Sequence, residues 1–201
     1  MGKDRPEPPE FLTFFCKTGN TVIGPGEPIV IPPETAKADF EAELMVVIGR
    51  RARRVAERDA WAYIAGYTVF NDVSACDYQK RTSQWMIGKS FDTFGPMGPA
   101  LVTADEVPDT HALDLALTLN GELRQKTNTR HMIFPIPFLI AALSAVLTLE
   151  AGDVIATGTP ARIPQAPGKP EYLQPGDVLR ITLEKVGELE NSVIAEGRPL
   201  P

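Results

Sequence analysis

Two glutamates and an aspartate beside apolar segments suggest a site for a divalent cation. Glu41 and Glu43 lie two residues apart at the start of an apolar segment that ends at Gly49, and Asp72 follows the next apolar segment, Tyr67–Phe70. Side chains alternate between the faces of a strand, so Glu41 and Glu43 point the same way. Three converging carboxylates repel one another by about 4 kcal/mol per pair at ~4 Å and an effective dielectric of about 20. A hard cation removes this repulsion, and all-oxygen ligation favours Mg²⁺, Mn²⁺ or Ca²⁺ over zinc.

The same pattern has a simpler interpretation. The wet face of a half-solvated antiparallel strand also alternates polar and apolar residues. The continuation Leu44–Ile48 is apolar on both faces, however, so Glu41 and Glu43 are not simply part of a solvated edge. This favours the metal site.

The length and patterning of the chain predict one domain, residues 1–201, of the α+β class. The chain has 201 residues, of which 43% are hydrophobic, enough to bury a sizeable core. Alternating leucines lead up to Asn120-Gly121, a strong signal for a β-hairpin. Two similar segments, Leu149–Ile155 and Leu173–Leu179, each predict a turn that leads into a strand. Further strands are predicted at Phe11–Cys16, Leu44–Ile48 and Tyr67–Phe70.

Helices are expected to be few and short. Val55–Ala65 predicts a short helix that ends at Gly66. Phe138–Leu147 predicts a buried helix. Pro135 and Pro137 would break its continuation upstream. The remaining segments are expected to be an irregular Pro-rich arm over residues 1–33, a helix or turn over Ser74–Gln84, a loop over Trp85–Phe94 and a mobile surface loop over residues 161–172.

Charge and composition argue against several classes of protein. The formal net charge is −6 and the longest basic run is Arg50–Arg54, so a nucleic-acid surface is not expected. No apolar stretch reaches the ~18 residues of a membrane span, and the first residues lack the apolar core of a signal peptide. Cys16 and Cys76 form no disulfide or metal-ligand pattern. We therefore expect a soluble, cytoplasmic protein.

Two other segments contain residues that suit an anionic ligand. Most lysines are solvated, but Lys89 lies between Gly88 and Ser90 among apolar and aromatic neighbours, which indicates a lysine held in a pocket. Gly158 lets backbone N–H groups approach an anion and Thr159 adds a hydroxyl, although this sequence also suits an ordinary turn.

Other catalytic patterns do not occur in the sequence. His111 falls in a polar loop, and His131 precedes an apolar segment with no carboxylate at ligand spacing, so neither is assigned a role. There is no Gly-x-Ser-x-Gly elbow, phosphate-binding loop or dinucleotide fingerprint.

Four motifs occur in order along the chain. They are Glu41–Gly49, Gly66–Gln79, Gly88–Pro99 and Leu149–Pro160. They match the patterns E-x-E-L-x-x-V-I-G, G-Y-T-x-x-N-D-V-S-A-R-D-x-Q, G-K-S-F-D-T-F-x-P-x-G-P and L-x-x-G-D-V-I-x-T-G-T-P. In these motifs the chain resembles the fumarylacetoacetate hydrolase family.

The resemblance implies a fold, a cofactor and roles for individual residues. The fold would be a mixed β-sandwich or roll with few short helices, usually assembled as a homodimer. The three carboxylates would bind the cation, usually Mg²⁺, while Gln79, Lys89 and Thr159 would face the substrate. Of these, Lys89 and Gln79 are the catalytic candidates.

The family's substrates are mostly 2-keto or 1,3-diketo acids of the acylpyruvate type, and its reactions pass through an enolate that a metal stabilises. The first expectation is therefore a metal-dependent hydrolase that cleaves a carbon–carbon bond. The alternatives are a decarboxylase, a keto–enol isomerase similar to 2-hydroxyhepta-2,4-diene-1,7-dioate isomerase, or a binding protein with an impaired active site.

Two departures from the family pattern bear on this choice. Cys76 replaces an arginine that would hold substrate oxygens. Many members also begin with an N-Y-x-x-H-x-x-E segment, whose His and Glu are thought to activate water, and the sequence enters the family pattern where that segment would end. Without such a general base, reactions that need only enolisation are favoured over hydrolysis.

Overall fold

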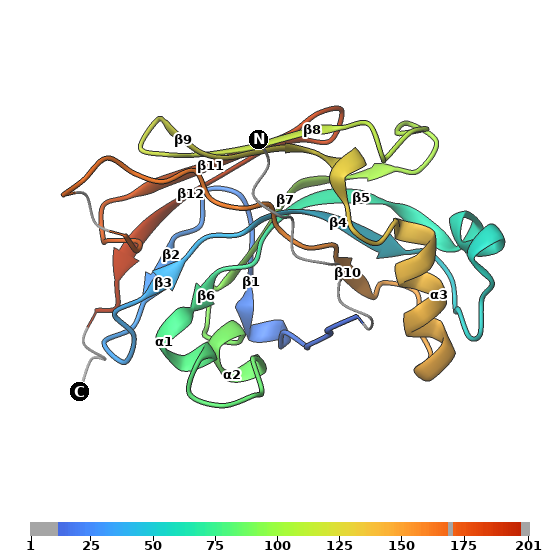
Figure 1. Cartoon of the computed structure of the whole chain (residues 1–201), viewed down its shortest axis with the longest axis horizontal. Coiled ribbons are helices and arrows are strands. Elements are labelled where there is room, and N and C mark those ends of the chain that lie inside the picture. Colours follow the sequence, from blue (N-terminus) through green and yellow to red (C-terminus); the bar gives the residue numbers. More distant parts are fainter. Residues whose placement is uncertain (1–11, 169–170, 198–201) are drawn as a thin grey trace, which may run out of the picture.

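The computed structural model describes residues 12–168 and 171–197, which form two five-stranded sheets and a two-stranded ribbon. The first sheet has the strand order β1-β7-β5-β4-β10 and the second has the order β2-β12-β11-β8-β9. In Figure 1, β8, β9 and β11 run above β4, β5 and β7, and one hydrophobic core includes residues of both sheets. The α+β prediction is confirmed.

The strands are β1 (Val22–Ile23), β2 (Ile29–Ile31), β3 (Ala38–Asp39), β4 (Ala42–Ile48), β5 (Ile64–Asn71), β6 (Ser74–Ala75), β7 (Gly95–Thr103), β8 (Asp114–Leu119), β9 (Glu122–Asn128), β10 (Val154–Ala156), β11 (Val178–Leu183) and β12 (Gly187–Ala195). The helices are η1 (Gly19–Thr21), η2 (Glu57–Tyr63), α1 (Cys76–Gln79), α2 (Met86–Lys89), η3 (Thr129–His131) and α3 (Ile136–Val146), where η denotes a 3₁₀ helix.

The pairing of β4 with β5 brings the acidic residues together. The two strands are antiparallel and Ala42 pairs with Asn71, so the start of β4 lies beside the end of β5. The backbone N–H of Asp72 donates to the carbonyl oxygen of Glu41 at 2.9 Å, which extends this pairing by one step. Residues about thirty positions apart in the sequence thus meet at one end of the sheet.

Two short helices lie beside this end of the sheet. In Figure 1, α1 and α2 lie next to β6, and α2 ends at Lys89. A side chain at Gly88 would lie only 2.5 Å from the backbone nitrogen of Gln79. Glycine at position 88 therefore allows α2 to pack directly against α1.

The hairpin prediction is confirmed. β8 and β9 pair as neighbours through a turn at Asn120-Gly121. Both turn residues have positive φ, 52° and 79°, as a type I′ turn requires. The two predicted turn-to-strand segments also lead into strands, namely β10 and β11.

The predicted helices differ from those observed. The helix expected at Val55–Ala65 is a 3₁₀ helix over Glu57–Tyr63. It ends before Ala65 because β5 already begins at Ile64. The loop expected at Trp85–Phe94 contains α2.

The prediction for α3 was wrong in its start and its burial. The helix begins at Ile136 and includes Pro137 in its first turn, where the missing N–H of proline has no helical partner to lose. One side is buried, through Ile136, Leu139 and Ile140, whereas Val146 is 76% exposed.

The predicted strand Phe11–Cys16 is not observed in the described residues. Phe11 lies outside them, and residues 12–16 have no regular secondary structure. The segment that follows contacts the site through a side chain instead, as described below. Within the described part of the chain, no helix is long and apolar enough to cross a membrane.

Candidate metal centre

The three acidic residues predicted to bind a cation form one cluster. Glu41, Glu43 and Asp72 each offer a carboxylate oxygen, and these oxygens all lie within 4.8 Å of one another. Glu43 and Asp72 are buried, while Glu41 is partly exposed. This donor set fits a hard divalent cation, because it consists of three converging carboxylates, of which that of Glu41 is partly exposed.

Lys89 bridges two of the carboxylates. Its Nζ donates to Glu41 Oε2 at 2.9 Å and to Asp72 Oδ2 at 2.7 Å, and its side chain is only 2% exposed. Burial lowers the pKa of Lys89, but the charges of Asp72 and Glu41 more than offset this, so the pKa is raised. In the protein without a bound cation, Lys89 is therefore an ammonium donor at neutral pH.

A second lysine reaches the same aspartate. Lys17 Nζ lies 2.7 Å from Asp72 Oδ1 and also donates to the carbonyl oxygen of Val73 at 3.0 Å. Burial lowers the pKa of Lys17 from its usual value, and the charge of Asp72 opposes that shift. The two oxygens of Asp72 thus face two different ammonium groups.

Glu43 is held by the backbone of the Thr-Gly-Thr-Pro segment. Gly158 has φ +99°, which glycine adopts readily, and its N–H donates to Glu43 Oε2 at 2.7 Å. Burial and the charge of Asp72 raise the pKa of Glu43 to about 8. The Gly158 N–H thus meets the carboxyl group of Glu43, and binding of an anionic ligand by this segment stays a prediction.

Burial also raises the pKa of Glu41, although Lys89 opposes the shift. The hydroxyl of Ser74 lies within hydrogen-bond distance of two acceptors, Glu41 Oε1 at 3.0 Å and the carbonyl oxygen of Asp72 at 2.9 Å. It can donate to one of them at a time, and the first of these hydrogen bonds supports the Glu41 carboxylate. Burial is the main reason that the pKa values of both glutamates are raised, and the neighbouring charge of Asp72 adds to it. A bound cation would stabilise the ionised carboxylates.

The two remaining predicted residues lie on neighbouring segments. Gln79 ends α1 and its backbone packs against Gly88, directly before Lys89. Thr159 follows Gly158, and its hydroxyl accepts a hydrogen bond from Gln125 Nε2 at 2.8 Å. Gln125 Oε1 in turn accepts from the N–H of Ala42, which ties this segment to the start of β4.

Cys76 occupies the position at which the family pattern has arginine. Its Sγ lies 3.9 Å from Asp39 Oδ2, and burial together with the charge of Asp39 raises the thiol pKa to about 11. The thiol is therefore protonated at neutral pH. A guanidinium does reach Asp39, since Arg162 Nη1 lies 2.6 Å from Asp39 Oδ1. The mobility expected for residues 161–172 stays a prediction.

The histidines have structural contacts. The N–H of Ile136 donates to His111 Nε2 at 3.3 Å, which ties this ring to the start of α3. His131 Nδ1 lies 3.3 Å from the hydroxyl of Thr127.

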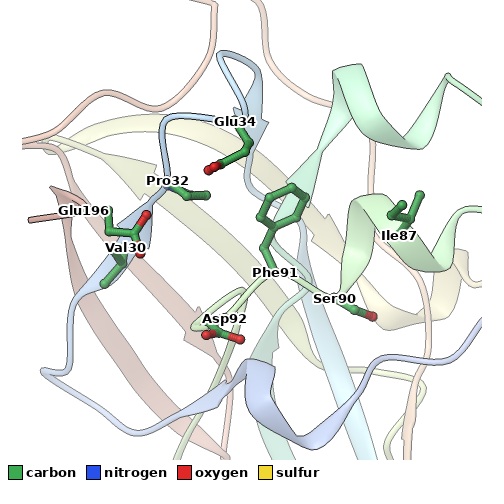
Figure 2. A pocket seen from close by; sticks show the side chains of 8 residues that line it. All are labelled: Val30, Pro32, Glu34, Ile87, Ser90, Phe91, Asp92 and Glu196. Carbon is green, nitrogen blue, oxygen red and sulfur yellow. The ribbon is translucent and has the colours of Figure 1, made fainter. Parts of the chain in front are cut away.

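A cavity of about 370 Å³ opens beside the segment that follows α2. Figure 2 shows Phe91 between Ile87 on one side and Pro32 and Glu34 on the other. The other residues that line the cavity are Val30, Ser90, Asp92 and Glu196. Neither the three clustered carboxylates nor the two lysines line it, so we treat it as a neighbouring feature.

The comparisons with known proteins decide the family. The family model described as Fumarylacetoacetate (FAA) hydrolase C-terminal matches residues 1–194. The chain belongs to the fumarylacetoacetate hydrolase family. Solved relatives share the fold described above.

One solved relative is 5-carboxymethyl-2-hydroxymuconate delta-isomerase from Mycobacterium smegmatis, with a TM-score of 0.85 and 39% identity over 98% of this chain and 74% of that one. Another is maleylpyruvate hydrolase from Sphingobium sp. SYK-6, in complex with manganese(II) ion and pyruvate, with a TM-score of 0.82 and 37% identity over 93% of this chain and 66% of that one.

Curated relatives of this fumarylacetoacetate hydrolase family member include two oxaloacetate tautomerases. The mitochondrial Fahd2a of Rattus norvegicus is 41% identical over 187 residues, which are 92% of this chain and 60% of that protein. The mitochondrial fahd2 of Xenopus laevis is 44% identical over 188 residues, which are 92% of this chain and 59% of that protein. The chain thus spans about 60% of the length of these relatives.

These names correct one expectation from the sequence. The cysteine pattern and the lack of an apolar leader indicated a cytoplasmic protein, but the relatives are named as mitochondrial. Neither feature distinguishes the cytosol from another reducing compartment. The cytoplasmic assignment is therefore wrong as an inference from composition.

Several residues of the site were missed by sequence reasoning. They are Lys17, Ser74, Gln125 and Arg162. Ser74 lies within the second motif and could have been included on that basis. The others lie outside all four motifs and carried no signal.

Proposed function

We propose that the chain is an enzymatic domain that interconverts the keto and enol forms of a 2-keto dicarboxylic acid of the oxaloacetate type, with a divalent cation as cofactor. The observation that carries the proposal is the cluster of three carboxylates, whose oxygens lie within 4.8 Å of one another. Lys89 donates hydrogen bonds to two of them. The names of the curated relatives support the choice of reaction.

Glu41, Glu43 and Asp72 would hold the cation. Carboxylate oxygens suit Mg²⁺ and Mn²⁺, and a solved relative is in complex with manganese(II). When bound, the cation would supply Lewis-acid polarisation of the substrate carbonyl, which stabilises an enolate. The Gly158 N–H holds Glu43 in place for this role.

Lys89 would supply a fixed positive charge to the same reaction. Its ammonium group is buried and hydrogen-bonded to Glu41 and Asp72, whose charges raise its pKa. It is therefore preorganised beside the carboxylate oxygens that would hold the cation. A preorganised donor of this kind stabilises an oxygen on which negative charge develops. Gln79 and Thr159 would anchor the carboxylate or carbonyl groups of the substrate by hydrogen bonds.

The direct test is to follow loss of enol-oxaloacetate by its ultraviolet absorbance. With Mg²⁺ we expect tautomerisation faster than in protein-free buffer with the same Mg²⁺, no excess over buffer with chelator, and recovery when Mg²⁺ is added back. Glu43→Gln should lose the activity while keeping its circular dichroism spectrum. A rate that chelator and Glu43→Gln leave unchanged would refute the proposal.

Carbon–carbon bond hydrolysis is the second candidate. It is favoured by the likeness to a maleylpyruvate hydrolase that was solved with pyruvate. Both reactions require an enolate, so the same protein sample should be tested on oxaloacetate and on an acylpyruvate. Fast release of pyruvate from the acylpyruvate would favour the hydrolase. Substrate binding with turnover of neither compound would favour an impaired binding protein.

A further inference from the structure

The site contains one more positive charge than the proposed chemistry uses. Lys17 Nζ lies 2.7 Å from Asp72 Oδ1, while Lys89 Nζ lies 2.7 Å from the other oxygen of the same carboxylate. Lys17 is 12% exposed, so its ammonium group is largely removed from solvent. Such a group keeps most of its electrostatic effect on its neighbours, because water screens it weakly.

The segment before β1 delivers this lysine together with an aromatic ring. The ring of Phe15 lies 4.9 Å from Lys89 Nζ and 5.9 Å from the ring of Trp85. Lys17 also donates to the carbonyl oxygen of Val73, directly after Asp72. Phe15 and Lys17 are two residues apart, so one short stretch of chain contacts Lys89 through the ring of Phe15 and Asp72 through Lys17.

The formal charge of the site shows what the second lysine changes. With the three carboxylates ionised, Lys17 and Lys89 leave a net charge of −1. A divalent cation then makes the site +1, which attracts an anionic substrate. Without Lys17 the loaded site would be neutral, and the empty site would attract a cation more strongly.

We infer that Lys17 is a positioning residue that weakens cation binding and strengthens binding of the anionic substrate. It acts through Asp72 and through its charge, and the inference rests on the proposed function for the identity of the anion. A merely structural lysine would behave differently, because its loss would weaken cation and anion binding alike.

The test is calorimetry of the full chain with Mg²⁺, followed by oxalate, a planar dianion, added to the Mg²⁺-saturated protein. In Lys17→Met we expect Mg²⁺ to bind roughly tenfold more tightly and oxalate roughly tenfold more weakly, the scale of one charge-assisted contact. Lys17→Arg, which keeps the positive charge, should bind both Mg²⁺ and oxalate with affinities close to those of the wild type. Lys126→Met, which removes an exposed lysine of β9, should match the wild type.

Lys17→Gln keeps a donor for Val73 and serves as a second variant if Lys17→Met does not fold. Weaker binding of both Mg²⁺ and oxalate in the folded variant, or an unchanged affinity for either, would overturn the inference. If oxalate does not bind the wild-type protein with Mg²⁺, the proposed function fails. The Mg²⁺ titration then still decides whether Lys17 opposes the cation.

Discussion

Lys89 is the residue whose charge is closest to the proposed chemistry. Its ammonium group is fixed by Glu41 and Asp72 and is 2% exposed. We expect Lys89→Met to lower kcat for oxaloacetate tautomerisation roughly 10²-fold to 10³-fold, the scale for losing one preorganised donor. Lys126→Met is the matched control in stopped-flow assays. An unchanged kcat for the folded Lys89→Met variant would remove Lys89 from the mechanism.

Glu43 should make the stability of the metal-free protein depend on pH. Burial and the charge of Asp72 raise its pKa to about 8, well above the value near 4.5 of an unperturbed glutamate. The folded state therefore holds this proton more tightly than the unfolded state does. Its contribution to stability is fully present below pH 4.5 and is lost as the pH rises through about 8.

Thermal unfolding in the presence of chelator measures this effect. The Tm should fall by several degrees between about pH 5.5 and about pH 8.5, and Mg²⁺ should reduce the fall because it stabilises the ionised carboxylate. Glu43→Gln should flatten the profile. A Tm that rises with pH in the wild-type protein with chelator would contradict the assignment.

At the scale of elements, the turn after β10 positions Glu43. Gly158 and Gly152 flank β10 with similar φ values of +99° and +94°, and a side chain at either would meet no atom within 4 Å. Alanine at either position should cost about 1 to 2 kcal/mol, because positive φ is unfavourable for residues other than glycine. Only Gly158 donates to Glu43.

The two alanine variants therefore separate stability from cation binding. Urea unfolding should show similar losses for Gly158→Ala and Gly152→Ala, while calorimetry should show weaker Mg²⁺ binding for Gly158→Ala alone. Equal Mg²⁺ affinity in the two variants would show that the Gly158 N–H does not support the site.

The sequence predicted those elements whose signal is local. The hairpin at Asn120-Gly121 follows from residues that tolerate positive φ, and the buried strand β4 follows from an unbroken apolar run. Strand alternation also predicted that Glu41 and Glu43 would share a face. The junction with Asp72 required the register of β4 against β5, which local patterns do not specify.

The elements that were missed depend on tertiary contacts. α2 is a single turn whose glycine packs on the backbone of Gln79, so helical periodicity could not indicate it. Lys17 comes from an irregular segment near several prolines, and its partner is 55 residues further along the chain. Long-range ion pairs of this kind leave no trace in composition or spacing.

At the scale of the whole molecule, assembly as a homodimer stays a prediction of the family resemblance. Apolar residues exposed on and near α3 and β10 are available for such a contact: Ile133, Val146, Leu147 and Val154. Light scattering coupled to gel filtration should give twice the mass of the chain, and Val146→Glu should shift it toward the monomer. A wild-type monomer at micromolar concentration would contradict the prediction.

The central claim is that one divalent cation binds between Glu41, Glu43 and Asp72. The most direct measurement is an anomalous difference map from crystals soaked with Mn²⁺, with Glu43→Gln crystals as the control. We predict a single strong peak within bonding distance of all three carboxylates in the wild-type protein and a weakened or absent peak in the variant. No peak at this cluster at millimolar Mn²⁺, or a peak unaffected by Glu43→Gln, would contradict the claim.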